Sequence, residues 1–94
     1  MNVCDGGTIT GGVTSIHFSN PNTGTSYTIT SCKDSNGNNM PGWPAIDPVI
    51  PAAANGVNGS HTVQLAVAAQ SGKTYTYTPS PACTIGTNPK IVVQ

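Results

Sequence analysis

Apolar and hydroxylated side chains alternate along several short segments, and no segment shows the spacing of an amphipathic helix. Over residues 62–68 the apolar residues Val63, Leu65 and Val67 fall at every second position, which is the period of a β-strand. We expect these three side chains to face inward and the residues between them to face outward. The pattern predicts a half-buried strand.

The same two-residue period recurs in other segments that are rich in β-branched and aromatic residues, as pleated, half-buried surfaces favour. Strands are expected at 14–18, 26–32, 73–78 and 90–94, with a short opening strand around 8–10. The side chains that this alternation turns inward are Ile16, Phe18, Tyr27, Ile29, Tyr75, Tyr77, Ile91 and Val93.

Turn-forming residues separate these predicted strands. The segments 20–24 and 70–73 both contain glycine and are short enough to form hairpin connections. Several short strands with such connections, and no helix, predict one all-β domain over residues 1–94. We expect a small antiparallel β-sandwich (Ig-like) or a partly open barrel.

The middle of the chain lacks this two-residue alternation. Residues 33–60 show no sustained alternation and form one long loop rich in Pro, Gly and Asn. A loop of this length in a small domain is usually functional or hides a missed element. Ala45–Ile46 and Val49–Ile50 are candidates for a brief edge strand, because the neighbouring prolines exclude a central one.

This loop carries the only tryptophan of the chain. Its candidate contact segment consists of Met40, Pro41, Gly42, Trp43 and Pro44. An aromatic ring held between prolines is a rigid platform for stacking on a sugar or docking into a partner. The alternative is that the ring folds back and caps a thin core.

Three cysteines, Cys4, Cys32 and Cys83, allow one disulfide and leave one thiol over. Which two of them pair cannot be read from the sequence. The alternatives are three reduced thiols or a metal site. A domain of this size buries a thin core, so a disulfide would stabilise it by about 3–5 kcal/mol.

Charged residues make up only 6% of the chain, and the formal net charge is zero. There is no basic surface for a nucleic acid and no apolar run long enough for membrane insertion. A polar but uncharged exterior suits proteins whose copies pack side by side, because like charges would repel each other. This composition favours an extracellular, cell-surface or virion location.

Catalytic and metal-binding signatures are weak. Ser60, His61 and an aspartate form a nominal triad, but no nucleophile motif accompanies them. The segment 34–38 begins like a calcium loop, yet its glycine stands at the fourth place and no acidic residue closes it, so a turn is expected. We expect no enzymatic activity and no cofactor.

The sequence therefore predicts a non-enzymatic structural or interaction module of an extracellular or surface assembly. Pilus or filament subunits, adhesin domains and virion decoration or spike proteins are of this kind. The expected partners are proteins, through self-association or another subunit, with strand edges and terminal segments making the contacts. The alternative is a carbohydrate-binding module that holds a glycan with Trp43 and neighbouring asparagines.

Overall fold

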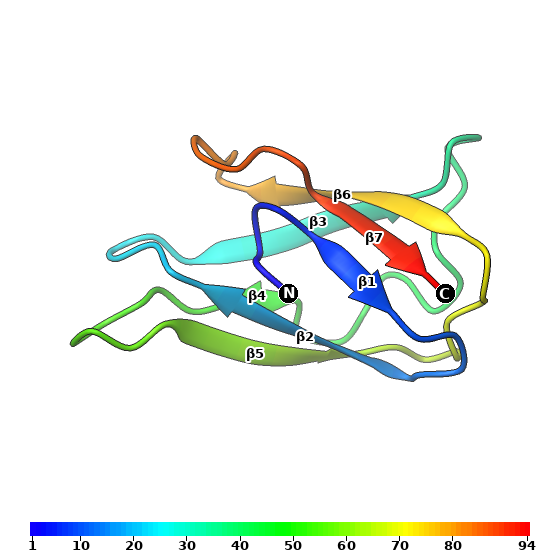
Figure 1. Ribbon diagram of the computed structural model, residues 1–94, viewed down its shortest axis with the longest axis horizontal. Coiled ribbons are helices and arrows are strands. Elements are labelled where there is room, and N and C mark those ends of the chain that lie inside the picture. The colour runs from blue at the N-terminus through cyan, green and yellow to red at the C-terminus, as the bar shows by residue number, and fades with distance from the viewer.

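Seven strands lie in two layers in the computed structural model, which describes residues 1–94 (Figure 1). The strands are β1 (Gly7–Ile9), β2 (Ser15–Asn20), β3 (Tyr27–Lys33), β4 (Val49–Ile50), β5 (Gly59–Gln64), β6 (Thr74–Ser80) and β7 (Lys90–Val93). One layer is a five-stranded sheet in the order β1-β7-β6-β3-β4, and the other is the pair β2-β5. The protein has no helix long and apolar enough to cross a membrane.

The core lies between the layers and is made by the alternating side chains. All the inward positions expected on β2, β3, β6 and β7 are at most 2% exposed, which confirms the two-residue pattern. Phe18 and Tyr77 meet at the centre of this core, with ring centroids 5.5 Å apart and planes at 75°. Such edge-to-face contacts between aromatic rings stabilise the packing of the two layers.

The strand order is that of an Ig-like sandwich. β2 pairs with β5 in one layer while β3, β6 and β7 are neighbours in the other, as strands B, E and C, F, G are in Ig domains. The prediction of an all-β fold is confirmed. A purely antiparallel arrangement is wrong, because β1 runs parallel to β7.

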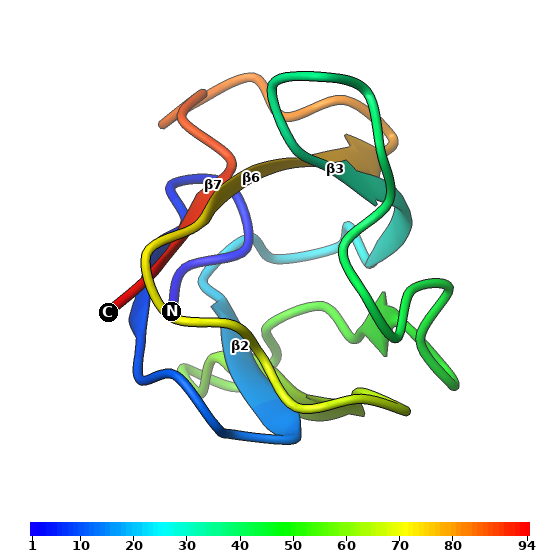
Figure 2. The same cartoon turned by 90° about the vertical axis from the view of Figure 1, so that its right-hand side faces the viewer.

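Two segments change layers and thereby close the sides of the sandwich. Near the N-terminus, the backbone of Val3 donates to Ser19 on β2, and the chain then continues into β1 beside β7. On the other side, Ile46 is bridged to Gln64 on β5, and the chain then continues into β4 beside β3. The large sheet consequently curves like half a barrel (Figure 2).

The two expected hairpins do not form. Residues 20–24 lie between β2 and β3, and residues 70–73 lie between β5 and β6, so each connection joins strands of different layers. The composition of a short turn fixes where the chain reverses. It does not fix whether the next strand pairs with the previous one or packs across from it.

The strand expected at 62–68 is shorter than its alternation suggested. Val63 and Leu65 are buried, but β5 ends at Gln64 and Val67 is 49% exposed, so the inward position of Val67 was wrong. Gly42 of the long loop lies against this segment, and a Cβ at Gly42 would come within 2.9 Å of the Val67 nitrogen. Here the long loop, and not a further strand, lies beside the residues that follow β5. The chain then continues to β6.

The long loop contains one of the two candidate edge strands, since Val49–Ile50 forms β4. Asn55 and Gly56 both have positive φ, and Ala54 and Val57 exchange backbone hydrogen bonds around them, as in a tight two-residue turn. The Asp34 carboxylate accepts the backbone N–H of Asn36 and Asn38, as expected for a turn.

Candidate functional site

The cysteines form one disulfide, between Cys4 and Cys83, with a Cα–Cα distance of 5.8 Å. Cys32 is a buried free thiol whose sulfur lies 3.8 Å from that of Met40. Burial raises the pKa of the Cys32 thiol to about 12. This thiol therefore stays protonated and unreactive at neutral pH. The chain contains no group of three His, Cys, Asp or Glu side chains placed to hold a metal ion.

The Trp43 side chain folds into the core. It is 8% exposed, and Met40 beside it is 1% exposed. The Met40 N–H donates to the Cys32 carbonyl, which ties the loop to the end of β3. Of the two alternatives for the ring, the structure takes the core cap, so a glycan stacked on an open Trp43 platform is not available.

The anchored loop instead exposes smaller apolar side chains where it runs beside the end of β5. Ile46 is 75% exposed and bridged to Gln64, while Val67 is 49% exposed beside Gly42. Pro44 and Ala66 are exposed as well. We call Pro44, Ile46, Ala66 and Val67 the edge patch. Figure 2 shows the loop that contributes Pro44 and Ile46 running from the large sheet to the other layer.

The nominal catalytic residues come together only in part. His61 Nε2 lies 2.8 Å from the Asp47 carbonyl oxygen and 3.8 Å from its carboxylate. Ser60 precedes His61 on β5, so its side chain faces the other side of the strand, opposite Ser19. A hydroxyl nucleophile does not meet this histidine, and the pair ties β5 to the loop.

The lysines gather on the outer face of the large sheet. Lys33 and Lys90 are the register partners of Thr76 on its two sides. Lys73 and Asp34 line the same depression as Lys90, and no hydrophobic residue lines it. These groups carry charges of both signs and are exposed to solvent, as on an ordinary hydrated surface. We therefore assign no binding site to this face.

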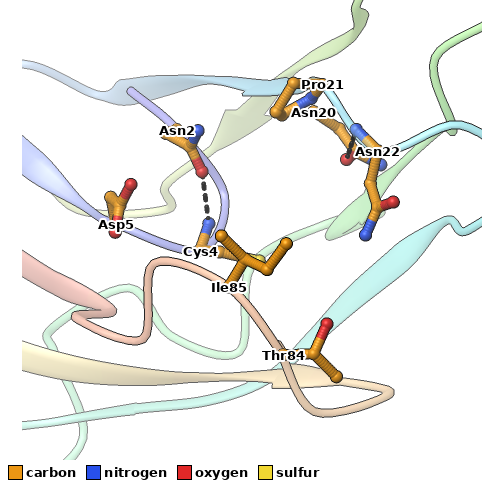
Figure 3. A pocket seen from close by; sticks show the side chains of 8 residues that line it. All are labelled: Asn2, Cys4, Asp5, Asn20, Pro21, Asn22, Thr84 and Ile85. Carbon is orange, nitrogen blue, oxygen red and sulfur yellow. Dashed lines mark hydrogen bonds between the residues drawn. The ribbon is translucent and has the colours of Figure 1, made fainter.

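A cavity of about 230 Å³ with a mixed polar and apolar lining lies beside the disulfide (Figure 3). Its lining residues are Asn2, Cys4, Asp5, Asn20, Pro21, Asn22, Thr84 and Ile85. They come from the N-terminal segment, the end of β2 with the connection after it, and the segment that follows Cys83. The sequence does not predict this cavity, because no motif links three segments that only the fold and the disulfide bring together.

The buried side chain of Asn20 supports one wall of the cavity. It is 0% exposed, and its amide nitrogen donates to the carbonyls of Thr25 and Pro51 at 2.8 and 3.0 Å. Its amide oxygen accepts the N–H of Asn22 at 2.9 Å. Because every bond of Asn20 goes to backbone, it fixes the connection after β2 against the neighbouring loops.

No family model matches this chain, and comparisons with curated proteins and with solved structures gave no match.

Proposed function

We propose that this protein is a non-enzymatic interaction module of an extracellular or surface assembly, and that copies of the chain contact each other through the edge patch. The observation that carries the proposal is the exposure of Ile46 and Val67 on neighbouring segments, at 75% and 49%. Apolar side chains that gather on an otherwise polar surface mark contact sites in soluble proteins.

A second copy is the partner that the charge distribution favours. The formal net charge is zero, and only Asp47 among the residues next to Ile46 is charged, so copies meet without strong repulsion. An apolar patch can also pair with itself around a two-fold axis, which is the commonest symmetry of soluble oligomers.

Side chains, rather than strand edges, make the contact in this proposal. The N-terminal segment is already hydrogen-bonded to β2 through Ser19, and β1 is paired with β7. The segment with Ile46 and β4 covers the opposite side. Exchange of a strand between copies would first have to break these bonds, so surface packing is the easier route.

The disulfide supports an extracellular or surface location for this protein. Disulfides persist in secreted and surface proteins and are rare in reducing compartments. Pilus or filament subunits, adhesin domains and virion decoration or spike proteins are the assemblies that combine such a location with a small, repeated β-domain.

Sedimentation velocity over a range of concentrations tests the proposal. The wild-type protein should form a dimer or larger species as its concentration rises. The double variant Ile46→Asp/Val67→Asp should remain monomeric, because two buried carboxylates without partners oppose association.

Val57→Asp is the matched control, since Val57 is also exposed, at 69%, but lies on the tight turn outside the edge patch. It should associate like the wild type. The proposal is wrong if the wild type stays monomeric at millimolar concentration, or if Val57→Asp weakens association as much as the double variant.

A further inference from the structure

We propose that the cavity beside the disulfide binds a single neutral sugar residue. Two asparagines in its wall are held in fixed orientations, and each leaves one polar atom free. The Asn2 amide oxygen accepts the Cys4 N–H at 2.8 Å, which leaves the amide nitrogen of Asn2 as a free donor. Tyr77 of β6 donates its hydroxyl to the Asn2 carbonyl at 3.1 Å and so holds this residue from the core side.

The second asparagine presents the opposite group. The Asn22 amide nitrogen donates to the Tyr27 hydroxyl at 2.6 Å, so its amide oxygen remains as a free acceptor. Figure 3 shows Asn2 and Asn22 lying on different segments around the cavity, with Asn20 and Pro21 between Asn22 and the rest of β2. A donor and an acceptor fixed on separate walls suit hydroxyl groups, which both donate and accept.

The remaining lining completes a site for a sugar. Asp5 and Thr84 add a carboxylate and a hydroxyl, and the backbone of Gly86 packs against the carboxylate so closely that a Cβ there would lie 2.4 Å from an Asp5 oxygen. Ile85 and Pro21 offer apolar surface to the C–H groups of a sugar ring. The disulfide tethers the segment with Thr84 and Ile85 to the N-terminal segment.

Charge and size narrow the class of ligand. The carboxylate of Asp5 is the only charged group in the lining, so phosphate, sulfate and uronic acid ligands are disfavoured. A volume of about 230 Å³ lies below the roughly 300–1,000 Å³ of sites for drug-sized ligands. One neutral sugar ring fits this space, and we expect a dissociation constant on the order of 1 mM.

Titration of the ¹⁵N-labelled protein, followed by amide chemical shifts, tests the site directly. The probes are the methyl glycosides of glucose, galactose and mannose, free N-acetylglucosamine, and glucuronic acid as the charged comparison. At least one neutral probe should shift the amides of Asn2, Asn22 and Thr84 in a saturable manner. Glucuronic acid should bind more weakly than that probe.

Asp5→Asn removes the charged acceptor while keeping its shape, and should weaken binding about tenfold. Thr84→Val, at an exposed position, should also weaken binding and serves as the second variant if Asp5→Asn does not fold. Asp47→Asn is the matched control, because it makes the same change at a residue outside the cavity lining and should leave binding unchanged. The proposal fails if no neutral probe shifts the lining amides, or if Asp47→Asn weakens binding as much as the variants in the cavity.

Discussion

At the scale of single residues, the alternation of apolar and polar side chains identified the core. Successive side chains of a strand point to opposite faces, so every second residue faces inward. The residues of β2, β3, β6 and β7 follow this rule. Trp43 and Val67 were different, because their burial depends on how the long loop lies against the end of β5. Strand alternation carries no information about a loop, so the sequence allows two alternatives for Trp43 and wrongly predicts an inward Val67.

Burial of Cys32 makes the stability of the protein depend on pH. Burial raises the pKa of its thiol from 9.0 to about 12, and burial also raises the pKa of Tyr75 and Tyr77. Above pH 9 the unfolded state loses these protons while the folded state keeps them, so the free energy of unfolding falls as the pH rises. Urea denaturation from pH 7 to 11 should show this decline.

Cys32→Ala is the informative comparison, because it removes the thiol contribution and leaves those of the tyrosines. Its stability should fall less steeply between pH 9 and 11 than that of the wild type. Equal slopes for the two proteins would mean that the thiol does not titrate differently on unfolding.

At the scale of elements, the sequence predicted most of the strands but not their partners. The residues 20–24 and 70–73 have the composition of hairpin turns, yet they connect the two layers. The sequence also indicates strands near β1 and at β4 but not their partners, because β1 and β4 are only three and two residues long. Pairing of such short strands is decided by contacts with distant residues and not by local pattern.

The pairing of β1 with β7 predicts that alanine is less well tolerated at Gly6 than at Gly37. Gly6 and Gly37 both have positive φ, at 65° and 81°, but a Cβ at Gly6 would lie 1.9 Å from the Lys90 carbonyl oxygen, while nothing lies within 4 Å at Gly37. Gly37→Ala should lower the free energy of unfolding by about 1–2 kcal/mol from backbone strain alone. Gly6→Ala should lower it by about 1–3 kcal/mol more, because β1 must also move away from β7.

Chemical denaturation of both variants measures the difference. If Gly6→Ala and Gly37→Ala are equally stable, then the N-terminal segment does not pack closely against β7.

At the scale of the whole molecule, Cys4 and Cys83 join segments 79 residues apart. The number of cysteines predicted one disulfide but not the pair, because pairing follows from the folded geometry. The cavity beside the disulfide and the edge patch belong to this scale as well. Each combines residues that are distant in the sequence, so no local sequence pattern predicts either of them.

The disulfide should be a major contributor to stability. Closing a loop of this length restricts the unfolded chain by about 4.5 kcal/mol in the chain-entropy model. Denaturation with and without reductant should show a loss of similar size on reduction, and Cys32→Ala should respond in the same way. A loss below about 1 kcal/mol would contradict this role for the Cys4–Cys83 bond.

The proposed assembly depends on contact between copies of the chain through the edge patch. Amide spectra of the ¹⁵N-labelled protein, recorded at increasing protein concentration, locate such a contact directly. We predict that the concentration-dependent shifts centre on Ile46, Ala66 and Val67. Shifts centred on β1 and the N-terminal segment, or spectra that do not change with concentration, would contradict the account.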